Sequence, residues 1–123
     1  MTSTQIPVHD YEVMRGDRLD FLVRYSPGGV PMAWSGASVQ ISVRGEEGLL
    51  IAIPESDITL VEPGELADED APNIIAGLSP DETKLLELGE RNLYQVRVID
   101  SEDNPRTALT GRITSHFSPI EGV

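Results

Sequence analysis

A chain of 123 residues with 21 acidic and nine basic side chains carries a formal net charge of −12. This length fits one domain, and the 39% apolar and 24% charged residues are typical of a globular fold rather than a disordered tail. A surface so negative repels phosphates and anionic headgroups, which argues against nucleic-acid and membrane partners. Cysteine is absent, which excludes disulfides, thiolate metal sites and a cysteine nucleophile.

The N-terminal segment carries neither a basic start nor an apolar middle, so it does not read as a secretory signal peptide. No apolar run approaches the roughly 18 residues of a membrane span, and we expect the chain to be made in the cytoplasm. Residues 1–10 are predicted to form a flexible arm. Within the arm, Ile6 and Val8 supply a small apolar anchor that would become ordered on a neighbouring subunit.

The first strands are predicted from apolar residues that recur with a period of two. Residues 18–25 alternate in this way and form one apolar face from Leu19, Phe21, Val23 and Tyr25. Residues 38–44 repeat the pattern. A Gly-Glu-Glu-Gly turn at 45–48 joins them to the apolar run 49–53, so these two strands are predicted to pair as a hairpin.

The middle of the chain supplies the entire net charge. Residues 46–90 hold 13 acidic residues and one basic residue, whereas the rest of the sequence is balanced. The densest part, residues 62–73, is rich in Pro, Gly and acids and is predicted to be an exposed loop between short strands at 58–61 and 73–77. This loop is a solvated, solubilising segment, an electrostatic docking surface for a basic partner formed by Glu65, Asp68, Glu69 and Asp70, or, least favoured, a metal site.

One short helix is predicted near residues 79–88. Ser79 and Glu82 have the spacing of a capping box, and Pro80 suits the first helical position. Three leucines follow at 85, 86 and 88 and give the segment an apolar side. At about ten residues such a helix is marginal alone and must lie on the sheet.

The last third of the chain is predicted to form two long strands. Residues 93–100 alternate cleanly, and residues 107–117 return after a turn, with one face made of Leu109, Ile113 and Phe117. About seven strands in all, punctuated by turns, predict an all-β antiparallel sandwich over residues 11–118, with a C-terminal tail at 119–123.

Residues that could carry chemistry are few. His9 and His116 lack the neighbours of a catalytic triad, because Ser115 and His116 are adjacent on a strand and point to opposite faces. Residues 100–104 offer oxygen ligands, but their spacing does not match a calcium loop and is typical of a hairpin turn. We therefore assign no catalytic, cofactor-binding or metal-binding residue.

Trp34 is the single tryptophan of the chain. One interpretation packs it at the edge of a sheet, and the other makes it a contact anchor for a partner. We favour packing, but we keep Trp34 among the candidate interaction residues.

The order of several motifs resembles a known group of proteins. Residues 15–23 open a strand with Gly-Asp, residues 35–44 read Ser-Gly-Ala-Ser-Val-Gln-Ile-Ser-Val-Arg, and residues 89–100 carry Gly followed by Tyr-x-Val before a late Gly in 107–114. This arrangement resembles small structural proteins of tailed phages, in particular the N-terminal domains of baseplate upper proteins. Trp34 stands where the group has an aliphatic residue, and Asn92-Leu93 separates Gly89 from Tyr94.

The resemblance implies an immunoglobulin-like sandwich that assembles into a virion, without enzyme activity or cofactor. The expected role is a non-enzymatic component of the tail, baseplate, neck, fibre adaptor or capsid surface. Its partners would be other virion proteins and further copies of itself. The alternative is a β-sandwich module that binds carbohydrate or a host surface, and an enzyme or metal protein is the least favoured interpretation.

Overall fold

The structure is a computed structural model that describes residues 7–68 and 70–117. About half of these residues are in strands, and the single α-helix among them has one turn. The strands are β1 (Tyr11–Met14), β2 (Leu19–Val23), β3 (Ser38–Gly45), β4 (Gly48–Ile53), β5 (Thr59–Leu60), β6 (Ile74–Leu78), β7 (Gly89–Ile99) and β8 (Pro105–His116). The helix is α1 (Pro80–Thr83), and three 3₁₀ turns are η1 (Pro27–Gly29), η2 (Glu55–Asp57) and η3 (Pro63–Glu65). No helix in the described segments is both long and apolar enough to cross a membrane.

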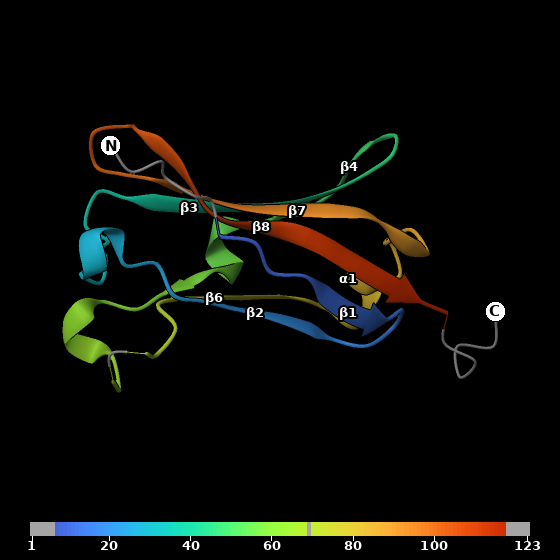
Figure 1. Cartoon of the computed structure of the whole chain (residues 1–123), viewed down its shortest axis with the longest axis horizontal. Helices are drawn as coiled ribbons and strands as arrows, with labels where there is room; N and C mark the ends of the chain where they lie inside the picture. The colour runs from blue at the N-terminus through green and yellow to red at the C-terminus, as the bar shows by residue number, and fades with distance from the viewer. Residues whose placement is uncertain (1–6, 69, 118–123) are drawn as a thin grey trace.

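The strands form two sheets (Figure 1). The larger sheet has the order β1-β8-β7-β3-β4, and the smaller has the order β2-β6-β5. All neighbouring pairs are antiparallel except β1 and β8, which run parallel. The predicted hairpin of residues 38–44 with 49–53 is present as β3 and β4. The mainly β fold with two sheets is thus confirmed, with one strand more than predicted.

A single apolar core lies between the two sheets. Its largest fully buried members come from both layers and include Phe21, Ile74 and Leu78 from the smaller sheet and Ile41, Tyr94 and Val96 from the larger. The buried positions alternate along β2, β3 and β7 as the period of two predicted. The intervening residues therefore form the outer faces of the sheets.

Residues 7–10, predicted within the flexible arm, lie against β8. Val8 forms a parallel bridge with Thr110, and the N–H of His9 donates to the Thr110 carbonyl at 3.0 Å. The hydroxyl of Tyr94 donates to the carbonyl of His9. These ladder contacts hold the segment to its own domain. They continue into β1, a strand too short for its alternation to stand out in the sequence.

The predicted helix near 79–88 is mostly a turn. The capping box is present, since the Ser79 hydroxyl accepts from the Glu82 N–H and the Glu82 carboxylate accepts from the Ser79 N–H. The α-helix nevertheless ends at Thr83. Only one of the three leucines, Leu86, enters the core. Spacings of one and two residues do not place three side chains on one face of a helix.

The residues that β8 buries also differ from those predicted for the inner face of the last strand. A register shift in β8 pairs Val96 with Leu109 but the next residue, Arg97, with Thr107, so Ala108 is an extra residue. Ala108 is buried, whereas Phe117 lies beyond the end of β8 and is half exposed. A bulge of this kind cannot be read from the alternation of apolar residues alone.

Candidate interaction surface

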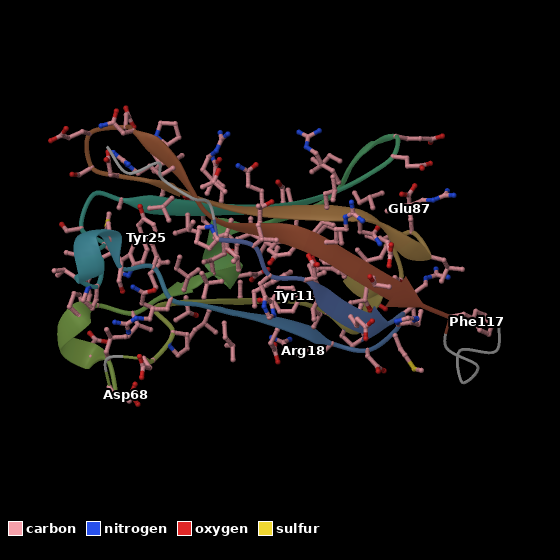
Figure 2. The ribbon with its side chains drawn as sticks, in the orientation of Figure 1. Tyr11, Arg18, Tyr25, Asp68, Glu87 and Phe117 are labelled. Carbon is pink, nitrogen blue, oxygen red and sulfur yellow. The ribbon has the colours of Figure 1, made fainter. Side chains whose placement is uncertain are left out.

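The outer face of the larger sheet carries polar side chains from two adjacent strands. Because Val39, Ile41 and Val43 point into the core, the intervening residues of β3 point outward. Together with outward residues of β7, they line a shallow hollow of about 190 Å³ formed by Gln40, Ser42, Arg44, Gln95 and Arg97. In Figure 2 this face is turned upward, away from the smaller sheet. The side chains that line this hollow are cationic or neutral.

The two arginines of the hollow differ from three other surface arginines in having no carboxylate partner among the described residues. Arg18, Arg91 and Arg112 lie 2.7, 3.4 and 3.9 Å from a carboxylate oxygen. Within residues 7–68 and 70–117, no carboxylate oxygen comes within ion-pair distance of Arg44 or Arg97. These two guanidinium groups therefore keep their charge available to an anionic partner.

The acidic loop (residues 62–73) lies on the opposite side of the molecule. It begins with η3 and connects β5 to β6 in the smaller sheet, and Figure 2 places Asp68 at its outer end. Glu65, Asp68 and Asp70 are exposed. Asp68 Oδ1 accepts from the Asp70 N–H at 2.8 Å, which gives this end of the loop a defined turn. The loop thus projects carboxylates into solvent.

Trp34 fixes the beginning of the acidic loop. Its indole Nε1 donates to the Val61 carbonyl at 3.0 Å, and its backbone N–H donates to the Glu62 carboxylate. The side chain is only 5% exposed and belongs to the core. Trp34 therefore packs within the domain, as we favoured, and has little surface to offer a partner directly.

Asn73 fixes the end of the loop. This buried side chain accepts from the Tyr25 N–H at 2.7 Å and donates to the Tyr25 carbonyl at 2.8 Å. The backbone N–H of Asn73 donates to Val23, and its carbonyl accepts from Val61. Hydrogen bonds at both ends hold the acidic loop in place on the smaller sheet.

The remaining predicted interaction residues are placed as follows. Val8 is 68% exposed although its backbone pairs with β8. Ile6 and Glu69 fall outside the described residues. Val8 therefore pairs with β8, whereas Trp34 contacts the beginning of the acidic loop at Val61 and Glu62.

Asp100 and His116, which the sequence singled out, both have partners within the domain. The backbone N–H of Asn104 is the main cause that lowers the pKa of Asp100, and Glu102 donates a second such bond. His116 lies 3.8 Å from Glu12 on the surface. In the part of the chain that the structure describes, no three His, Asp or Glu side chains gather as metal ligands would. The two backbone hydrogen bonds to the Asp100 carboxylate close residues 100–104 into a hairpin turn, as predicted for that segment.

The two arginines of the hollow were not among the interaction residues predicted from the sequence. The alternation within residues 38–44 and 93–100 implies that Arg44 and Arg97 lie on the outward faces of their strands, but it does not show which outward residues become neighbours. In the sheet, Gln40 pairs with Arg97 and Ser42 pairs with Gln95. The sequence carries no signal for this hollow, because nothing in residues 38–44 or 93–100 predicts that the two strands are neighbours in one sheet.

Comparison with known proteins adds no assignment: no protein-family model matches the chain, and no curated protein matches it significantly.

Proposed function

We propose that this chain is a non-enzymatic structural protein of a tailed bacteriophage particle, acting through protein–protein contacts in the tail, baseplate, neck, fibre adaptor or capsid surface. The observation that carries the proposal is a well-packed β domain that presents a firmly held acidic loop on one side and a cationic hollow on the other. Complementary charged surfaces fix the choice and register of partners in an assembly. The motif order that resembles baseplate upper proteins supplies the phage context.

We also propose an immunoglobulin-like topology for the two sheets. Such sandwiches place the first, second, fifth and fourth strands in one sheet and the third, sixth and seventh in the other, with two strands added beside the third in variable-type domains. Taking β2 as the second strand and β4 as an added one gives the orders β2-β6-β5 and β8-β7-β3-β4, which agree with this scheme. The first strand, β1, departs from it by pairing with β8 in the larger sheet. The chain departs from antibody domains in having no cysteine pair, and Trp34 precedes β3 instead of lying on it.

Mass spectrometry of purified particles tests the functional proposal. We expect the chain to remain with intact particles through a density gradient, in a fixed ratio to the major structural proteins. Cross-linking within the particles should yield peptides that join this chain to other virion proteins. Finding the protein in the lysate but not in intact particles would contradict the proposal.

The carbohydrate-binding alternative receives less support. A sugar platform commonly uses exposed aromatic rings, but Trp34 and Tyr94 are 5% and 1% exposed. A glycan array with the purified protein tests this alternative directly, and specific binding to one glycan class would favour it over the structural role.

A further inference from the structure

The cationic hollow on β3 and β7 has the chemistry of a receptor for an acidic segment. Arg44 and Arg97 flank it, Ser42 and Gln95 lie between them, and Gln40 lies beside Arg97. Arg97 pairs with Gln40, four residues from Arg44 along β3, so the two arginine stems are about 14 Å apart. That spacing suits two carboxylates three to five residues apart on an irregular loop.

The acidic loop of the same chain carries carboxylates at that spacing. Glu65, Asp68 and Asp70 are exposed, and the loop is hydrogen-bonded at both ends. Because its ends are already ordered, little conformational entropy is lost when the loop docks. The strands β3 and β7, which line the hollow, lie on the opposite side of the domain from the acidic loop (Figure 1), so one molecule cannot bring the loop and the hollow together.

We infer that the hollow of one copy receives the acidic loop of a second copy. Charge complementarity selects this occupant: the hollow is cationic on a chain whose net charge is −12, and the densest acidic segment belongs to that chain itself. The two contacting surfaces are different, so the contact is head-to-tail and generates rings or open filaments. This inference deepens the proposed function by naming the contact through which copies join.

Single surface ion pairs are weak, so the contact should be concentration-dependent and sensitive to salt. Sedimentation velocity of the purified chain should show oligomers at high protein concentration in low salt. These oligomers should dissociate at about 0.5 M NaCl, where screening acts within a few ångströms. A chain that stays monomeric at every concentration in low salt would overturn the inference.

Two complementary variants test the geometry. Arg44→Gln with Arg97→Gln removes the cations of the hollow but leaves the acidic loop. Glu65→Gln with Asp68→Asn and Asp70→Asn removes three carboxylates of the acidic loop but leaves the cationic hollow. We expect each variant alone to be monomeric, whereas an equimolar mixture forms one-to-one dimers and nothing larger, because only one functional contact is available. Failure of the two variants to pair would overturn the head-to-tail contact.

Controls matched in charge separate this contact from a general effect of net charge. Arg18→Gln with Arg91→Gln removes two exposed arginines elsewhere, and Glu47→Gln with Glu55→Gln and Glu102→Gln removes three exposed acids outside the loop. Both controls should still form oligomers, and thermal melts should show that every variant is folded. Equal loss of association in the controls would contradict the inference. Because these experiments use the isolated protein, their failure leaves the virion proposal to be judged by the particle experiment.

Discussion

Tyr94 is the side chain that joins the N-terminal segment to the core. It is 1% exposed, and its ring centroid lies 5.4 Å from those of Tyr11 and Phe21. Its hydroxyl donates to the carbonyl of His9, so residues 7–10 are held by a partly buried hydrogen bond as well as by the β8 ladder. Burial raises the pKa of Tyr94, with smaller contributions from Tyr11 and Asp10, and burial also raises the pKa of Tyr11.

These raised pKa values predict a loss of stability in alkali. The unfolded chain releases each phenolic proton near pH 10.0, whereas the folded chain holds it to a higher pH. Stability is therefore fully present below about pH 10 and falls as the pH rises above that value. Urea unfolding followed by circular dichroism should give a constant midpoint from pH 7 to 9 and a declining midpoint above pH 10.

Tyr94→Phe provides the control for this pH dependence. Removing the hydroxyl leaves the His9 carbonyl without its donor, and we expect it to cost about 1 kcal/mol at neutral pH. The alkaline decline should become shallower, because the group with the larger shift no longer titrates. An unchanged decline in the variant would contradict the assignment to Tyr94.

Gly111 makes room for the same N-terminal segment. A Cβ at this position would lie 2.0 Å from the carbonyl oxygen of His9 and 3.0 Å from the Tyr94 ring. Gly111→Ala must therefore displace backbone, and we expect a loss of more than about 2 kcal/mol in the free energy of unfolding. Gly64→Ala is the control, because a Cβ at Gly64 meets nothing within 4 Å. Equal stabilities of the two variants would show that residues 7–10 are not packed on β8.

At the scale of elements, alternation predicted the strands that have one buried and one exposed face. The apolar residues of β2, β3 and β7 recur every second position and are buried as expected. Alternation could not predict β1, because the strand has only four residues and is specified by its parallel pairing with a strand about 100 residues away. Nor could it predict the extra residue at Ala108, which depends on how two strands register.

The capping box of the short helix α1 was predicted correctly, but the helix is shorter than the predicted segment 79–88. A capping box specifies where a helix begins, not how far it continues. After Thr83 the chain turns, and the side chain of Asn92 closes that turn by bonding both the N–H and the carbonyl of Glu87. The buried amide of Asn92 also donates to the Ile113 carbonyl. These distant contacts stabilise a turn where local propensity favoured helix.

Thr83, the last residue of α1, attaches the helix to the turn between β1 and β2. Its buried hydroxyl accepts from the Gly16 N–H at 3.0 Å and donates to the Asp17 carbonyl at 2.8 Å. Thr83→Val keeps the shape but leaves both backbone groups without this partner, and we expect a loss of about 1–3 kcal/mol. Thr59→Val, at an exposed position in β5, should change stability by less than about 0.5 kcal/mol. Chemical denaturation of both variants checks this, and similar values would argue against the Thr83 contacts.

At the scale of the whole molecule, charge is separated between two surfaces. The sequence located the acidic loop, because its charge is contiguous along the chain. It did not reveal the cationic hollow, because Arg44 and Arg97 are 53 positions apart and become neighbours only when β3 pairs with β7. Predicting such a site requires the order of strands in a sheet, which depends on contacts between distant parts of the chain.

This separation predicts two salt effects of opposite sign. The net charge of −12 destabilises the compact monomer through self-repulsion. Screening by about 0.5 M NaCl should therefore raise the melting temperature of dilute, monomeric protein. We expect a rise of a few degrees, since about 1 kcal/mol corresponds to roughly 4 °C for a domain of this size. The same salt should dissociate the oligomers formed at high protein concentration, because the contact between loop and hollow joins opposite charges.

Differential scanning calorimetry of dilute protein at increasing salt, together with sedimentation at high concentration, separates the two effects. Glu47→Gln with Glu55→Gln and Glu102→Gln lowers the net charge to −9 without touching the loop or the hollow. Its melting temperature should respond less steeply to salt than that of the natural chain, whereas its oligomers should keep the same sensitivity. Equal salt slopes for the melting temperatures would mean that long-range repulsion does not limit the stability of this domain. The acidic residues would then act only through their local contacts.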